Sequence, residues 1–125
     1  MAQIERNDVR VLVVEDNEDT AESVRSLLSQ CGYQVMVAHT GQEGLTTARK
    51  LQPHVVLCDI GLPDGDGYAV ASVLRQGSSG DARIIAVTGH GEASDRRRAL
   101  AAGFDEHLVK PVDPRVLLDA IHMFG

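Results

Sequence analysis

The stretch Val55-Val56-Leu57-Cys58-Asp59 decides the fold, because four consecutive apolar residues end at a single carboxylate. A short apolar run rich in β-branched residues is typical of a strand that is buried on both faces of a parallel sheet. Similar runs recur along the chain, and their polar ends are Glu15-Asp16, Thr88 and Lys110. If these runs are parallel strands, all four polar ends emerge at one edge of one sheet, where open α/β folds build their sites.

Segments with helical periodicity separate the apolar runs. The apolar positions Val24, Leu27, Leu28 and Cys31 follow the spacing i, i+3, i+4 and i+7, which is typical of an amphipathic helix. We predict strands at residues 10–15, 33–38, 55–59, 83–88 and 106–109, and helices at residues 18–31, 41–51, 67–76, 92–102 and 114–124. Helix-stop glycines at Gly32 and Gly103 agree with these bounds.

Regular alternation of strands and helices predicts parallel strands joined by right-handed crossovers. The expected fold class is therefore α/β, a doubly wound five-stranded parallel sheet in a flavodoxin-like (βα)5 three-layer sandwich. Of the two common strand orders, five strands suit 2-1-3-4-5, which places the ends of strands 1 and 3 side by side. In that order Asp16 faces Asp59.

Composition limits the kind of protein. With 125 residues, 43% hydrophobic and 24% charged, we expect one globular domain over residues 1–125 with a core at about 10–124. No apolar stretch is long enough for a membrane helix, so we expect a cytoplasmic protein without membrane contact. The formal net charge of −6 argues against direct nucleic-acid binding. Cys31 and Cys58 lack a C-x-x-C spacing, and we expect buried thiols in a reducing compartment.

The predicted cluster of Glu15, Asp16 and Asp59 has a specific chemistry. Two like charges about 4 Å apart repel by roughly 4 kcal/mol at an effective dielectric constant of about 20, so the cluster must take up a proton or recruit a cation. Oxygen ligands that leave room for water and phosphate favour Mg²⁺, with Mn²⁺ as a second choice. Lys110 and Thr88 would then hold phosphoryl oxygens, and Asp59, alone at its strand end, is the candidate nucleophile for an acyl phosphate.

Four strings now match a known family. They are Val-Val-Glu15-Asp16-Asn17, Asp59-Ile-Gly61-Leu-Pro63-Asp-Gly-Asp-Gly67, Val-Thr88-Gly89 and Val-Lys110-Pro111. In this order, each at the end of a predicted strand, they make the chain resemble the CheY-like response-regulator receiver domain of two-component signalling, from about Arg10 to Phe124. A receiver of this kind is itself a standard example of the 2-1-3-4-5 order.

The resemblance implies a role for each site residue. Asp59 accepts the phosphoryl group, and Asp16, Asp59 and the carbonyl of Gly61 bind Mg²⁺, with Glu15 acting through water. Thr88 and Lys110 hold phosphoryl oxygens, and Pro111 stands at the family's cis-proline position.

The resemblance also implies that the protein is a switch and not a turnover enzyme. It would catalyse only its own phosphorylation and dephosphorylation. The donor would be a histidine kinase or a histidine phosphotransfer protein, and Thr88 would bias the face made by the fourth helix, fifth strand and fifth helix. The output would be a downstream protein or a missing output domain. The chain is either free-standing or part of a hybrid kinase, and either a monomer or a phosphorylation-dependent dimer.

Some positions depart from the family's pattern. His107 stands three residues before Lys110, where the family usually has an aromatic residue that follows the hydroxyl residue's movement. Either it switches, with a charge that responds to pH, or it is an ordinary strand histidine. Gly61, Gly89 and His90 occupy the positions that tune phosphoryl access and hydrolysis.

Two alternatives stay open at this point. One is a haloacid-dehalogenase-like phosphatase with an aspartyl-phosphate intermediate, although such enzymes usually carry a second acid where this chain has Gly61. The other is an interaction domain that kept the fold and works without phosphate.

Overall fold

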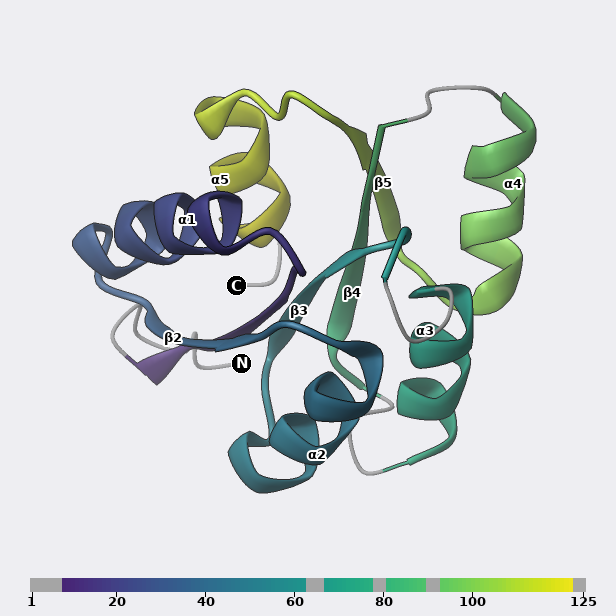
Figure 1. The fold of residues 1–125 in the computed structure, drawn as a ribbon, viewed down its shortest axis with the longest axis horizontal. Helices are drawn as coiled ribbons and strands as arrows, with labels where there is room; N and C mark the ends of the chain where they lie inside the picture. Colours follow the sequence, from purple (N-terminus) through teal and green to yellow (C-terminus); the bar gives the residue numbers. More distant parts are fainter. Residues whose placement is uncertain (1–7, 63–66, 78–80, 90–92, 123–125) are drawn as a thin grey trace, which may run out of the picture.

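A computed structural model describes residues 8–62, 67–77, 81–89 and 93–122 of the chain. Within these residues strands and helices alternate along the whole sequence (Figure 1). The strands are β1 (Arg10–Val14), β2 (Gln34–Ala38), β3 (Val55–Asp59), β4 (Arg83–Thr88) and β5 (Glu106–Val109). The helices are α1 (Glu18–Gln30), α2 (Gly41–Leu51), α3 (Gly67–Gln76), α4 (Ala93–Ala102) and α5 (Pro114–His122).

The described strands form one parallel sheet in the order β2-β1-β3-β4-β5. This result confirms the predicted fold class and strand order. Because β1 lies between β2 and β3, the chain reverses its winding direction there, and the carboxyl ends of β1 and β3 lie next to each other. The polar residues that follow these two strands are therefore neighbours in space although they are far apart in sequence.

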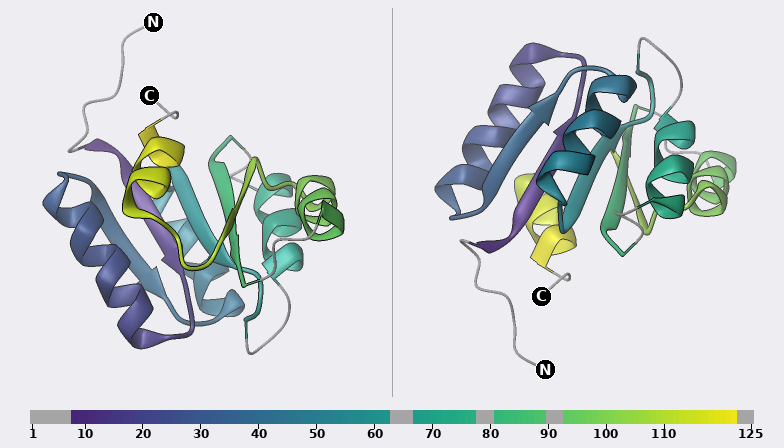
Figure 2. Two further views of the ribbon diagram at one scale, coloured as in Figure 1. Left: turned by 90° about the horizontal axis from the view of Figure 1, so that it is seen from above. Right: turned by 90° about the horizontal axis from the view of Figure 1, so that it is seen from below.

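Helices cover both faces of the sheet (Figure 2). Alternate strand residues point to opposite faces, so the central strands β1, β3 and β4 contribute to two cores. One core packs Leu12, Val56 and Ile84 against α2, α3 and α4, and the other packs Val11, Val55 and Ile85 against α1 and α5. All six of these side chains are fully buried, which explains why the apolar runs are continuous.

The helix ends follow from residues that the sequence offers. Asn17 and Thr40 accept backbone N–H groups from Thr20 and Glu43 and so cap the first turns of α1 and α2. Gly103 follows α4 with a φ of 116°, a left-handed conformation that glycine adopts without steric cost. Pro114 is the first residue of α5, where its missing N–H costs no helical hydrogen bond.

Several predicted bounds were wrong by one residue. We predicted that the first strand ends at residue 15 and the second begins at residue 33, but they end at Val14 and begin at Gln34. Cys31, which we predicted to be the last residue of the first helix, caps α1 and lies outside it. Glu15 still donates its N–H to the Ala38 carbonyl, so pairing with β2 extends beyond the strand itself. The fourth helix is described from Ala93, and its predicted start at residue 92 lies outside the described residues; the fifth helix is described to His122. Its predicted extension to residue 124 lies outside the described residues.

Two predictions from composition can be compared with the structure. Cys58 is buried as expected, but Cys31 is only half-buried, because it caps the end of a surface helix. Among the helices of the described segments, none combines the length and the apolar character that crossing a membrane requires.

Candidate functional site

The acidic residues predicted from the sequence meet at the carboxyl edge of the sheet. Glu15 and Asp16 follow β1, and Asp59 is the last residue of β3. Each of the three side chains offers a carboxylate oxygen, and these three oxygens all lie within 4.8 Å of one another. Glu15 is buried, Asp59 is half-buried and Asp16 is exposed, so the cluster has one side open to solvent. Three oxygen donors at this spacing fit a hard divalent cation such as Mg²⁺.

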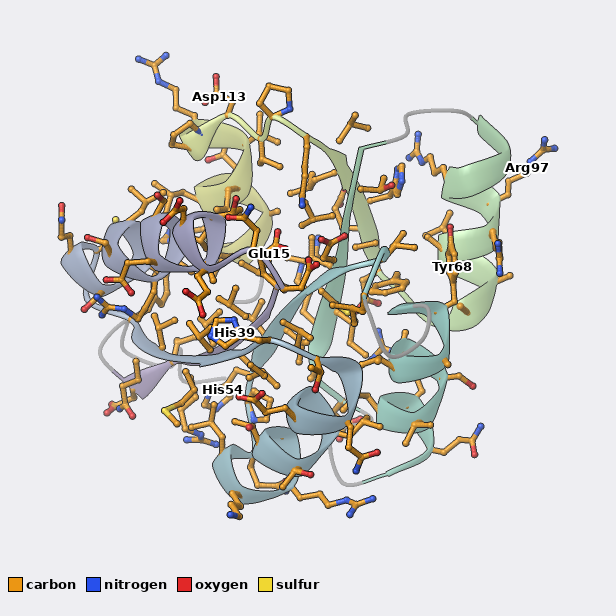
Figure 3. All side chains as sticks on the ribbon, in the orientation of Figure 1. Glu15, His39, His54, Tyr68, Arg97 and Asp113 are labelled. Carbon is orange, nitrogen blue, oxygen red and sulfur yellow. The ribbon has the colours of Figure 1, made fainter. Side chains whose placement is uncertain are left out.

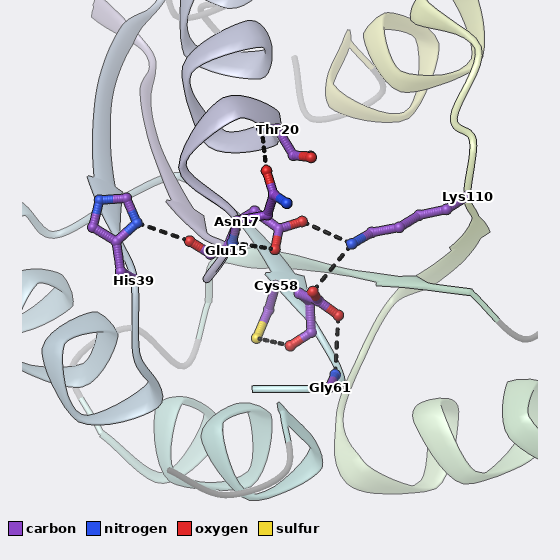
Figure 4. Close-up of polar contacts among 8 residues, drawn as sticks. Glu15, Asn17, Thr20, His39, Cys58, Gly61 and Lys110 are labelled. Carbon is purple, nitrogen blue, oxygen red and sulfur yellow. Dashed lines mark hydrogen bonds and ion pairs between the residues drawn. The ribbon is translucent and has the colours of Figure 1, made fainter. Parts of the chain in front are cut away.

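Lys110 joins the two more buried carboxylates (Figure 4). Its Nζ lies 2.8 Å from Oε1 of Glu15 and 3.1 Å from Oδ2 of Asp59. Burial alone would lower the pKa of Lys110, but the two carboxylates outweigh it and hold that pKa above its usual value. The ammonium is therefore charged at neutral pH and partly compensates the two acids. Its side chain comes from the residue after β5, so a third strand end contributes to the cluster.

The carboxylate of Asp59 is held at both oxygens. The Gly61 N–H donates to Oδ1 over 2.9 Å, while Oδ2 contacts Lys110. Burial would raise the pKa of Asp59, but the Gly61 N–H, the contact with Glu15 and the Lys110 ammonium together keep that pKa below its usual value. Asp59 is therefore ionised at neutral pH, as a nucleophilic carboxylate must be.

Glu15 is the most buried acid of the cluster, with 5% of its surface exposed. Burial raises its pKa above the usual value, although Lys110 and the Asn17 N–H, which donates to Oε2 over 3.2 Å, act in the opposite direction. Its backbone carbonyl lies 3.0 Å from Nδ1 of His39, and Figure 3 shows the two residues close together near the end of β2. The neighbouring segments thus fix Glu15 through its side chain and its backbone.

Thr88 and Pro111 lie on the strand ends beside Asp59. Thr88 is the buried last residue of β4, the strand next to β3, and its carbonyl accepts the Lys110 N–H over 2.7 Å. The peptide bond between Lys110 and Pro111 is cis, the isomer that the resemblance implies. Gly89 is exposed, and a Cβ atom placed there would meet nothing within 4 Å in the part of the chain that the structure describes. His90 lies outside the described residues.

His107 lies on β5, opposite Ala86 of β4. It is half-buried, and its Nε2 atom is buried with no hydrogen-bond partner among the described groups. Because His107 and Lys110 are three residues apart on a strand end, their side chains leave the backbone on opposite faces of the sheet. His107 therefore does not belong to the carboxylate cluster itself.

Sequence reasoning did not assign two residues that support the cluster. His39 lacks the spacing of a metal-binding pair, and Asn17 stands in the sequence only as part of the string that follows the first predicted strand. The available signal was position: His39 is the first residue after β2, so it emerges at the same sheet edge as Glu15. Asn17 precedes α1 and has the side chain of a helix cap.

Comparison with known proteins gives a consistent result. Residues 11–122 match the family described as the response regulator receiver domain. The KDP operon transcriptional regulatory protein KdpE of Escherichia coli K12 is 40% identical over 101 residues, which cover 81% of this chain and 44% of that protein. The probable transcriptional regulator ycf27 of Cyanophora paradoxa is 37% identical over 91% of this chain and 47% of its own length. The chain thus spans about half the length of these curated relatives.

Solved structures agree with the sequence relatives. The CheY-like receiver domain protein from Methanospirillum hungatei JF-1 superposes with a TM-score of 0.86 at 32% identity, over 92% of this chain and 91% of that one. The chemotaxis protein CheY4 of Vibrio cholerae gives a TM-score of 0.88 at 27% identity, over 94% of this chain and 98% of that one.

Proposed function

Because this chain belongs to the response regulator receiver domain family, the receiver domains of two-component response regulators, we propose that it is a phosphorylation switch whose acceptor is Asp59. The observation that carries the proposal is the contact of one ammonium, Lys110, with both Glu15 and Asp59 beside three clustered carboxylates. A carboxylate, an ammonium and a cation-binding acid cluster are the groups that an acyl phosphate requires around it.

The chemistry follows from the positions of these groups. A carboxylate oxygen of Asp59 attacks the phosphorus of a phosphohistidine, the phosphorus–nitrogen bond breaks, and the imidazole leaves with its electron pair and takes a proton. Lys110 remains within reach of the acceptor and pairs with a phosphoryl oxygen. The Gly61 N–H holds the carboxylate in a fixed orientation. Thr88, buried at the end of the neighbouring strand, supplies a hydroxyl for another phosphoryl oxygen.

We assign the metal site to the same cluster. Glu15, Asp16 and Asp59 would hold Mg²⁺, or Mn²⁺, together with the carbonyl of Gly61. The bound cation supplies positive charge that neutralises the phosphoryl oxygens during transfer. Without the cation, the doubly charged phosphoryl group would approach three carboxylates. Lys110 would compensate only one of their charges.

The proposed donor is a histidine kinase or a histidine phosphotransfer protein, and the proposed output is a partner protein or an output domain. The surface formed by α4, β5 and α5 supports this role, because Leu100, Val109 and Val116 are each between 43% and 48% exposed. Large apolar side chains exposed on a surface are candidates for contacts with a partner. Adding about 1.5 to 2 negative charges at Asp59 would shift the equilibrium between two conformations of that face.

The deciding experiment is phosphorylation by a small acyl phosphate, followed by intact-protein mass spectrometry with and without Mg²⁺. We expect a Mg²⁺-dependent mass gain in the wild type and in Asp119→Asn, which removes an exposed acid of α5 away from the cluster. We expect no gain in Asp59→Asn. An equal gain in Asp59→Asn would show that Asp59 is the wrong acceptor. Steady turnover of a phosphomonoester would instead favour the phosphatase alternative.

A further inference from the structure

The half-buried ring of His39 is joined to the backbone of Glu15 (Figure 4). Its atom Nδ1 lies 3.0 Å from the carbonyl oxygen of Glu15. A carbonyl oxygen can only accept a hydrogen bond, so Nδ1 must carry a proton and donate it. In the neutral ring, Nε2 then carries no proton. The contact therefore fixes the tautomer of His39 as well as the orientation of its ring.

This hydrogen bond forms where the regular pairing of β1 with β2 stops. The last paired residues of the two strands are Val14 and Ala38. One residue farther along the chain, the Glu15 N–H still donates to the Ala38 carbonyl over 2.9 Å. Beyond that point the His39 side chain supplies the donor for the Glu15 carbonyl. Both peptide units of Glu15 are therefore held against the end of β2, one by a backbone group and one by a side chain.

The second of these peptide units places Asp16. The Glu15 carbonyl and the backbone nitrogen of Asp16 belong to one planar group, so a hydrogen bond to the carbonyl restricts where the Cα atom of Asp16 lies. Asp16 is the exposed acid of the cluster. The other two acids, Glu15 and Asp59, share the Lys110 ammonium. Burial and ion pairing thus constrain those two carboxylates, whereas the position of the Asp16 carboxylate depends mainly on its backbone.

We propose that His39 is a positioning residue for the cation site. By donating from Nδ1 to the Glu15 carbonyl, it keeps the Asp16 carboxylate close to the other two, within the 4.8 Å that the three oxygens span. Groups behind the ligands of a metal site orient these ligands and so set its affinity. His39 acts only through the backbone and does not itself bind the cation. Its role rests on the Mg²⁺ site proposed above, because it concerns the affinity of that site.

Variants of His39 separate hydrogen-bond donation from packing. His39→Asn keeps an N–H donor near the position of Nδ1, whereas His39→Leu has a similar size and no donor. We expect His39→Leu to bind Mg²⁺ about two- to tenfold more weakly than the wild type, and His39→Asn to stay within about twofold of it, since one hydrogen bond has this worth. His122→Leu, which removes an exposed histidine at the end of α5, should bind Mg²⁺ as the wild type does.

Two NMR measurements on the unphosphorylated protein give the result. Titration with Mg²⁺, followed by the amide signals of Asp16 and Gly61, measures the affinity of each variant. Long-range ¹⁵N spectra of the neutral His39 ring in the wild type should show a proton on Nδ1 and none on Nε2. Circular dichroism without Mg²⁺ checks that each variant is folded, and His39→Ala, which also lacks the donor, replaces His39→Leu if leucine disturbs the fold. A loss of stability alone would not change the Mg²⁺ affinity of the folded protein.

The proposed role is wrong if the variant without a donor binds Mg²⁺ as tightly as the wild type, or if His39→Asn binds as weakly as that variant. It is also wrong if the proton of the neutral ring lies on Nε2. A wild type that binds no Mg²⁺ would overturn both the cation site and the role of His39. Wild-type Mg²⁺ binding without acyl-phosphate labelling of Asp59 would reject the proposed acceptor, while weaker binding in His39→Leu would still support the role of His39.

Discussion

Two glycines near Asp59, the proposed acceptor, differ in what a side chain would meet. Among the described residues, a Cβ atom at Gly61 would have only Oδ1 of Asp59 within 4 Å, at 3.8 Å. A Cβ atom at Gly67 would lie 2.7 Å from the Asp59 carbonyl oxygen and 2.9 Å from the Ile60 Cα. Gly61 therefore has room for a side chain among the described residues, whereas Gly67 lets the start of α3 approach the end of β3.

The first prediction concerns Gly61. We expect Gly61→Met to leave the free energy of unfolding within about 0.5 kcal/mol of the wild type, since the position has room for a side chain. The added side chain would cover the acceptor, so the acyl phosphate should hydrolyse more slowly. The measurement is the half-life of the labelled protein after the donor is removed. An unchanged or shorter half-life would show that Gly61 does not control access of water.

The matched prediction concerns Gly67. Gly67→Ala should destabilise the fold by about 1–3 kcal/mol in urea unfolding, because the methyl group would collide with the backbone of Asp59 and Ile60, which cannot move without disturbing β3. Gly61→Ala, the same change in open space, is the control. Equal stabilities for the two alanine variants would contradict this interpretation of the glycines.

At the scale of secondary structure elements, Arg10 and His54 connect β1 to the end of α2 and the start of β3. The Arg10 guanidinium donates to the carbonyls of Leu51 and Gln52, which the end of α2 leaves without helical partners. The backbone N–H of Arg10 donates to Nδ1 of His54 over 3.0 Å. His54 must therefore be unprotonated at Nδ1 to accept this hydrogen bond.

This contact predicts a pH dependence of stability. Burial, and then the charge of Arg10, lowers the pKa of His54 below its usual value of about 6.5. A lowered histidine pKa means that the unfolded state binds the proton more tightly. The contribution to stability is therefore complete above about pH 6.5 and is lost as the pH falls through the folded-state pKa.

We expect the free energy of unfolding to fall more steeply below pH 6.5 in the wild type than in His54→Asn, whose amide oxygen can replace Nδ1 as an acceptor without titrating. Urea unfolding at several pH values from about 7.5 to 5 measures the two slopes. His122→Asn, which changes an exposed histidine at the end of α5, should keep the wild-type slope. Parallel slopes for the wild type and His54→Asn would rule out His54 as the source.

At the scale of the whole molecule, the acid cluster concentrates negative charge where β1 and β3 end. A cation that binds only the folded state raises stability by mass action, by about 2.7 kcal/mol at a concentration one hundred times its dissociation constant. We expect Mg²⁺ to raise the unfolding midpoint of the wild type and of Asp119→Asn, and to have much less effect on Asp16→Asn. If Mg²⁺ stabilises Asp16→Asn as strongly as the wild type, Asp16 does not hold the cation.

The sequence alone determined the elements, their order and the edge where the site forms. Continuous apolar runs such as Val55-Val56-Leu57-Cys58 can be recognised because strand and helix periodicities are local properties of the chain. Polar residues at the ends of parallel strands must meet at one edge, so Glu15, Asp16, Asp59 and Lys110 could be grouped before any coordinates were known.

Only the tertiary structure decided which atoms touch. Lys110 reaches Glu15 across 95 residues of sequence, and His39 and Asn17 hold Glu15 through groups that no motif marks. The cavity lined by residues of α1 and α5 likewise depends on how these two helices pack on one face of the sheet. Periodicity states which face a side chain occupies, whereas rotamers, strand register and the packing of neighbouring elements set its partners, and these are properties of the whole fold.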